Sequence, residues 1–178
     1  LIMPNIEFIS NKIEKLTALI LTHAHEDHIG AVPYLFEKLG NVPIYTTSFT
    51  ASVLKRKLES VGIKEYQINL MEYGKELNLN HFKIEIFSMT HSIPESNALM
   101  IKTTNGNIFH SGDWKLDPHP LIGEAISSQK LQNFVNDGVD VMICDSTNVF
   151  NMTPSGSEND VRENLKKIFS NKKEGKII

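Results

Sequence analysis

The sequence is poor in cysteine and has neither a long apolar run nor an excess of basic residues. Its one cysteine, Cys144, excludes a disulfide within the chain, and its place in the apolar run 139–144 predicts a buried thiol. No stretch of about 18 apolar residues is present, which argues against a membrane span. The first residues also lack the pattern of a secretory signal peptide. We therefore expect a cytoplasmic protein with no membrane partner.

The charge balance gives no support to a nucleic-acid binder. The formal net charge is −3, with 18 Lys and Arg residues against 21 Asp and Glu residues, whereas such binders usually display a basic surface. Bound divalent cations would offset part of this negative charge. With 40% hydrophobic and 22% charged residues, the composition is that of a globular domain with a real core.

Strand-like and helix-like apolar patterns alternate along the chain, which is typical of an α/β fold. The nearly continuous apolar run 16–22 predicts a strand buried on both faces. Further strands are predicted at 42–46, 66–71, 76–79, 82–90, 97–103, 107–111 and 139–145, with a type I′ hairpin turn at Asn105-Gly106. Helices are predicted at 28–39, 49–61, 125–136 and 158–169, with Ser48 capping the second and a capping box of Ser157 and Asp160 starting the last.

Both ends of the sequence have the pattern of interrupted strands. Residues 1–3 resemble the end of a strand, and residues 175–178 resemble the beginning of another. We therefore expect the chain to be part of a longer domain, truncated at both ends.

The strongest chemical signal is the segment 23–28, His-Ala-His-Glu-Asp-His, where the first buried strand ends. His23 and His25 are two residues apart, so in an extended segment both rings can reach one metal ion. Asp27 and His28 follow into the next helix and can face a second ion. Glu26 alternates away from these ligands and is left out of the site. The alternative is a solvated loop that happens to be rich in histidine and acidic residues.

Two distant residues favour the metal site over the solvated loop. His91 follows the predicted strand 82–90, and Asp113 follows the predicted strand 107–111, so each lies just past the end of a strand. Among the other histidines, His81 falls in a turn and is expected in solvent, and His119 is expected in a loop. His110 either supports Asp113 or is a partly buried structural residue.

These residues resemble the successive metal-binding motifs of the metallo-β-lactamase superfamily. Segments 22–34 (THAHEDHIGAVPY), 91–96 (HSIPES), 110–117 (HSGDWKLD) and 145–148 (DSTN) narrow the resemblance to the ribonuclease J family of the β-CASP group. The resemblance implies a partial αββα sandwich, in which residues 1–178 form the N-terminal part of a metallo-β-lactamase domain. The β-CASP domain and the C-terminal region would then lie outside this chain.

The resemblance also implies roles for the site residues. His23, His25 and His91 would hold one ion, Asp27 and His28 a second, and Asp113 would bridge them, with Asp27 and Asp113 also catalytic. These donors suit two zinc or manganese ions. The second site would be one protein ligand short, so we expect it to bind weakly in this chain. Asp145 would match the first acidic motif of the β-CASP group and support the site, or it caps a turn at the end of a strand.

The function implied is hydrolysis of RNA phosphodiester bonds by a hydroxide bound between two metal ions. The intact enzyme would degrade RNA from the 5′ end, cut internally as well, and form a homo-oligomer. The present chain would be monomeric and nearly inactive by itself. Two alternatives are another hydrolase of this fold, such as a thioesterase, and a catalytically silent RNA-binding paralogue. The segments HSIPES and DSTN disfavour the first, and the complete set of ligands within the covered region disfavours the second.

Overall fold

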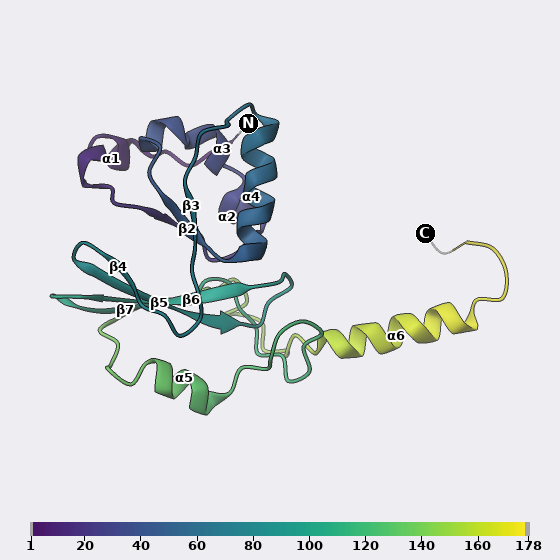
Figure 1. Ribbon diagram of the computed structural model, residues 1–178. Helices are drawn as coiled ribbons and strands as arrows, with labels where there is room; N and C mark the ends of the chain where they lie inside the picture. The colour runs from purple at the N-terminus through teal and green to yellow at the C-terminus, as the bar shows by residue number, and fades with distance from the viewer. Residues whose placement is uncertain (1, 177–178) are drawn as a thin grey trace.

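The computed structural model describes residues 2–176 and contains two β-sheets that lie between layers of helices (Figure 1). The first sheet is parallel, with the order β1 (Leu19–Ile20), β2 (Ile44–Thr46) and β3 (Ile68–Leu70). The second has the order β4 (Leu77–Leu79), β5 (Phe82–Met89), β6 (Ser96–Thr103), β7 (Gly106–His110) and β8 (Val141–Ile143). Its strands are antiparallel except that β8 runs parallel to β7.

Most of the helices cover the outer faces of the two sheets. Those beside the first sheet are α1 (Glu7–Ser10), α2 (Glu26–Ile29), α3 (Val32–Leu35) and α4 (Ser48–Ser60), with short 3-10 turns at Ile13–Lys15 and Glu37–Leu39. Helix α5 (Ser128–Phe134) lies on the far side of the second sheet, and α6 (Glu158–Asn171) projects away from the body (Figure 1). The layers therefore follow the order helix, sheet, sheet, helix that the resemblance implies. Within residues 2–176, no helix is both long and apolar enough to cross a membrane.

Three apolar clusters lie among the described residues, and two of them join each sheet to its covering helix. In the first, Leu54 and Leu58 of α4 are fully buried against Ile44 of β2, because residues four apart share one face of a helix. In the second, Met100 of β6 packs in the cluster that also receives Phe134 of α5. The ends of the strands that carry the candidate ligands are thus fixed on packed sheets.

Two predicted elements differ in extent from those observed. The single helix expected at 28–39 is divided into α2, α3 and a 3-10 turn. The break between α2 and α3 has a local cause, because Pro33 has no N–H with which to continue the ladder of α2. In the hairpin between β6 and β7, Thr103 pairs with Gly106, so the turn residues are Thr104 and Asn105. Neither of these two residues has a positive φ, whereas a type I′ turn requires a positive φ at both.

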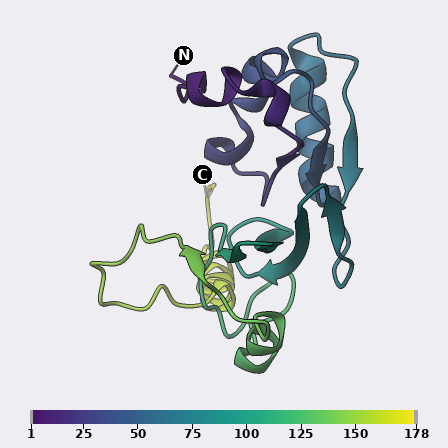
Figure 2. The same cartoon turned by 90° about the vertical axis from the view of Figure 1, so that its left-hand side faces the viewer.

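The predicted burial of segment 139–145 and of Cys144 is wrong for this chain. Val141 and Ile143 of β8 are about half exposed, and Cys144 is exposed. Strand β8 is the last of its sheet, and the segment that follows it leaves the body as a long loop before α6 (Figure 2, green to yellow). An apolar run predicts burial only if a neighbouring element covers it, and no element of residues 2–176 covers β8. The interrupted strands expected at 1–3 and 175–178 fall partly outside the described residues, and their described parts form no strand.

Helix α6 is attached to the second sheet through its first turn. The N-cap predicted at Ser157 is confirmed, since its Oγ accepts a hydrogen bond from the N–H of Asn159. The acidic partner is Asp117 rather than the expected Asp160. Buried Asp117 accepts hydrogen bonds from the N–H groups of Glu158 and His119, both at 2.9 Å, and its Oδ2 lies 3.2 Å from Lys115 Nζ. This carboxylate therefore joins the loop after β7 to the start of α6.

We expect Asp117→Asn to loosen this attachment. Burial disfavours the charged form, but the N–H groups of Glu158 and His119 and the neighbouring Lys115 together hold the pKa of Asp117 well below its ordinary value of 3.8. Loss of one acceptor beside these donors should cost about 2 kcal/mol, which corresponds to about thirtyfold faster amide exchange in the first turn of α6. Hydrogen exchange followed by mass spectrometry measures this.

The pH dependence has a definite sign. Because the pKa of Asp117 is lowered in the folded state, the stabilisation is complete above pH 3.8 and decreases as the pH falls towards the folded-state pKa.

The control for the exchange experiment is Asp140→Asn. This exposed carboxylate also accepts a hydrogen bond from a backbone N–H, that of Asn107, and its loss should have little effect. Equal exchange in the two variants would contradict the role of Asp117.

Candidate metal centre

The six predicted ligands lie at one end of the two sheets, four of them on three loops and two, Asp27 and His28, in the short helix α2 that continues the first loop. The first loop follows β1, the second follows β5 and the third follows β7. Strands end at a common edge of each sheet, so loops distant in sequence meet there, as the sequence analysis expects. The structure places the six side chains in two overlapping groups, which are His23, His25, His91 and Asp113, and Asp27, His28 and Asp113.

The first group contains three imidazoles that face one point. His25 Nδ1 lies 3.2 Å from His23 Nε2 and 3.0 Å from His91 Nε2. Oδ2 of Asp113 lies 3.8 Å from the Nε2 atoms of both His23 and His91. His23 is fully buried, whereas the other three residues are partly exposed. The group is therefore closed to water on the side of His23 and open to solvent on the opposite side.

The second group shares Asp113 with the first. Its Oδ1 lies 3.2 Å from His28 Nε2, which is 3.5 Å from Oδ2 of Asp27. The two oxygens of Asp113 are thus divided between the two groups. This is the arrangement that a carboxylate needs to bridge two cations. Asp27 is at the solvent side, with 78% of its side chain exposed.

The donor set fits a divalent metal ion. In a tetrahedral zinc site with Zn–N bonds of about 2.0–2.1 Å, neighbouring ligand atoms are about 3.3–3.4 Å apart. The separations of 3.0 to 3.8 Å in the first group bracket this value. In addition, Nδ1 of His25 faces two imidazole nitrogens but can form one good hydrogen bond, whereas one shared cation would satisfy all three nitrogens. Imidazole and carboxylate ligands suit zinc or manganese.

The electrostatics favour the ligand form of two histidines. Burial is the largest cause that lowers the pKa of His23, to about 4, and the nearby His28 adds to it, against the opposite effect of Asp113. Burial, followed by the proximity of His25, lowers the pKa of His91. Both rings are therefore neutral at neutral pH, and neutral imidazole is the form that binds metals.

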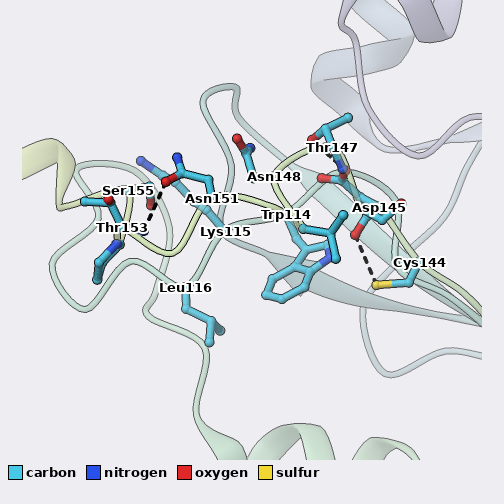
Figure 3. Close-up of a pocket in the computed structure, with 13 residues that line it drawn as sticks. Trp114, Lys115, Leu116, Cys144, Asp145, Thr147, Asn148, Asn151, Thr153 and Ser155 are labelled. Carbon is cyan, nitrogen blue, oxygen red and sulfur yellow. Dashed lines mark hydrogen bonds between the residues drawn. The ribbon is translucent and has the colours of Figure 1, made fainter.

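Asp145 lies outside both ligand groups. Its Oδ1 accepts hydrogen bonds from the N–H and the Oγ1 of Thr147, both at 2.9 Å, which is an Asx turn. Its own N–H donates to Ser111 Oγ at 3.0 Å. Asp145 lines a pocket with Trp114 and Thr147 (Figure 3). These contacts are those of the turn-capping alternative, and the supporting role implied by the resemblance stays a prediction.

The remaining candidates behave largely as expected. His81 and His119 are exposed. His110 Nδ1 accepts a hydrogen bond from the N–H of Gly112 at 3.0 Å, so it supports the loop that carries Asp113. Glu26 turns away from the ligands and pairs with Lys57 of α4.

Sequence reasoning missed three residues that connect the ligand loops to their surroundings. Glu95 accepts a hydrogen bond from the N–H of Phe49 at 2.8 Å and so caps α4, a role expected for Ser48. Ser96 and Asn97 are each 1% exposed and hydrogen-bond to the other two ligand loops. Glu95 and Ser96 lie within the segment HSIPES, which contributes to the family resemblance, but no local pattern indicates which distant backbone atoms they contact.

Comparisons with known proteins identify relatives of this chain. Residues 3–158 match a family model described as a beta-lactamase superfamily domain. Ribonuclease J of Sinorhizobium meliloti is 39% identical over 179 residues, an alignment that covers 99% of this chain and 31% of that protein. Ribonuclease J of Thermus thermophilus is 35% identical over 176 residues, with coverage of 95% and 31%. The chain thus spans 31% of the length of each of these two relatives.

Solved structures share the fold at low sequence identity. A protein of unknown function from Enterococcus faecalis has a TM-score of 0.61 at 18% identity, covering 86% of this chain and 39% of that one. A metallo-beta-lactamase fold protein from Bacillus subtilis has a TM-score of 0.51 at 18% identity, covering 73% and 50%. Together with the family model, these neighbours confirm the predicted fold class.

Proposed function

Because the chain belongs to the beta-lactamase superfamily, we propose that it is the metal-binding part of a metal-dependent ribonuclease of the ribonuclease J kind. The resemblance to ribonuclease J is confirmed by relatives that match the whole length of the chain. The observation that carries the proposal is the carboxylate of Asp113, whose two oxygens face two separate groups of ligands.

Each side chain has a role in this proposal. His23, His25 and His91 would hold one divalent ion, Asp27 and His28 a second, and Asp113 would be shared by both. The bound ions would supply a nucleophile from water at neutral pH and offset charge that develops on a phosphoryl group. Asp27 stands at the exposed side, where its carboxylate can orient a water molecule or accept its proton. Buried His23 excludes water from beneath the centre.

We propose further properties on the family resemblance and not on the geometry. They are degradation of RNA from the 5′ end with internal cleavage in addition, a cytoplasmic location, and a homo-oligomeric complete protein. The second group offers three protein ligands, and the chain spans 31% of the length of the Sinorhizobium meliloti relative. We therefore expect weak binding of a second ion and little nuclease activity in the chain by itself. The β-CASP domain and the support from Asp145 belong to the same proposal.

The test is cleavage of a 5′-monophosphorylated RNA by the complete gene product. We expect cleavage with manganese, loss of cleavage after chelation, and recovery when manganese is restored. A thioester and a β-lactam are tested separately as alternative substrates, and neither should be hydrolysed. Hydrolysis of the thioester without cleavage of RNA would favour the other hydrolases of this fold. RNA binding with neither cleavage nor bound metal would favour the silent paralogue.

A further inference from the structure

Two buried side chains at the start of β6 connect the three loops of the metal centre. We propose that Asn97 and Ser96 are positioning residues, which fix the loops of His23 and Asp113 against the loop of His91 and so set the affinity for the first metal ion. The inference rests on the metal centre of the proposed function, but it concerns residues outside the ligand set.

Both polar atoms of the Asn97 side chain form hydrogen bonds. Its Nδ2 donates to the backbone oxygens of Thr22 at 2.9 Å and Glu95 at 2.6 Å, and lies 3.4 Å from Thr47 Oγ1. Its Oδ1 accepts a hydrogen bond from the hydroxyl of Tyr73 at 2.7 Å. Thr22 directly precedes the first ligand, and Glu95 belongs to the loop of His91. One side chain therefore ties the first loop to the second.

Ser96 makes the matching connection to the third loop. Its Oγ donates to the backbone oxygen of Asp113 at 3.0 Å. Neighbouring residues of a strand point to opposite sides, so Ser96 and Asn97 can hold different loops. The third loop is also pressed against β6, since a Cβ at Gly112 would lie 2.5 Å from the backbone oxygen of Asn97. The start of β6, directly after the loop of His91, is thus the link between the other two loops.

Asn97 is connected to the metal ligand His23 through Thr22. Thr22, whose carbonyl it fixes, places its Oγ1 3.1 Å from Nδ1 of His23. The other nitrogen of that ring, Nε2, faces His25 and Asp113. A hydrogen bond to the far nitrogen of a metal-binding imidazole fixes its orientation, and loss of such an outer contact typically lowers metal affinity by about 10- to 100-fold. Displacement of Thr22 should therefore weaken binding without removing any ligand.

The experiment measures zinc binding without RNA. The complete gene product is stripped of metal and titrated with zinc against a chromophoric chelator, as wild type, Asn97→Ser and Ser96→Ala. We expect each substitution to raise the Kd of the tightest zinc site by about tenfold or more. The absorption spectrum of the cobalt-substituted protein should change in parallel, because it reports the geometry of the ligands.

The control is Thr50→Ala, which removes a buried side chain of α4 whose Oγ1 has no hydrogen-bond partner among the described residues. It should leave the zinc Kd within about twofold, because the side chain that it shortens forms no hydrogen bond to a ligand loop. If Asn97→Ser does not fold, Ser96→Ala decides, since it removes one hydroxyl.

Folded variants with the Kd and cobalt spectrum of the wild type would overturn the positioning role. A wild type that binds no zinc would overturn it together with the metal centre. A wild type that binds zinc but cuts no RNA would overturn the proposed function, while the variants would still decide the positioning role.

Discussion

Asp113→Ala is expected to abolish RNA cleavage by the complete gene product, with a loss of about a thousandfold or more in the single-turnover rate. The reason is geometric, because its Oδ2 belongs to the group of His23 and His91 while its Oδ1 belongs to the group of His28. One substitution therefore removes a donor from both sites. The measurement is cleavage of 5′-monophosphorylated RNA at saturating manganese.

Two further variants make this prediction specific. Asp113→Asn keeps one neutral oxygen, so its activity should fall between those of wild type and Asp113→Ala. Asp137→Ala removes an exposed carboxylate that pairs with Lys102 far along the sheet, and it should cleave RNA normally. If Asp113→Ala cleaved RNA as fast as Asp137→Ala, the shared carboxylate could not be the centre of the site.

Gly112→Ala is expected to destabilise the protein by about 3 kcal/mol and to weaken zinc binding together with it. Gly112 has a φ of +57°, and an added Cβ would lie 2.5 Å from the backbone oxygen of Asn97. Neither strain can be relieved by rotating a side chain. The loop must instead move, and Asp113 is the next residue. Thermal unfolding of the metal-free protein and zinc titration measure the two effects.

Gly62→Ala separates the two causes. Gly62 has a φ of +86°, but a Cβ there meets no other atom within 4 Å. It should therefore show the backbone strain alone, about 1 kcal/mol, with unchanged zinc affinity. Should Gly112→Ala prove as mild as Gly62→Ala, the close packing of the third loop on β6 would be refuted.

The candidate ligands could be found from the sequence because their signal is local. Alternate residues of an extended segment point the same way, so the spacing of His23 and His25 predicts a shared target. The positions of His91 and Asp113 at strand ends predict a common edge. In the structure, the ligand atoms of each group lie within 4.8 Å of one another, a proximity that the spacing alone could not guarantee.

The residues around the ligands could not be found in this way. Asn97 contacts Thr22 and Tyr73, which are 75 and 24 positions away, and these contacts depend on how β6 lies against the loops. Asp117 likewise caps a helix that begins 41 residues later. The exposure of Cys144 could not be predicted for the same reason, because burial of its thiol depends on a neighbouring element that the apolar pattern does not specify.

The most direct test of the metal centre is the metal content of the purified complete gene product, measured by elemental analysis. We expect divalent metal in the wild type and in His119→Ala, and the loss of at least one ion per chain in His91→Ala. His91 and His119 are both histidines of loops that follow strands of the second sheet, but His91 faces His25 and Asp113 whereas His119 is exposed. Metal-free wild type, or equal metal content in the two variants, would contradict a centre built from three converging loops.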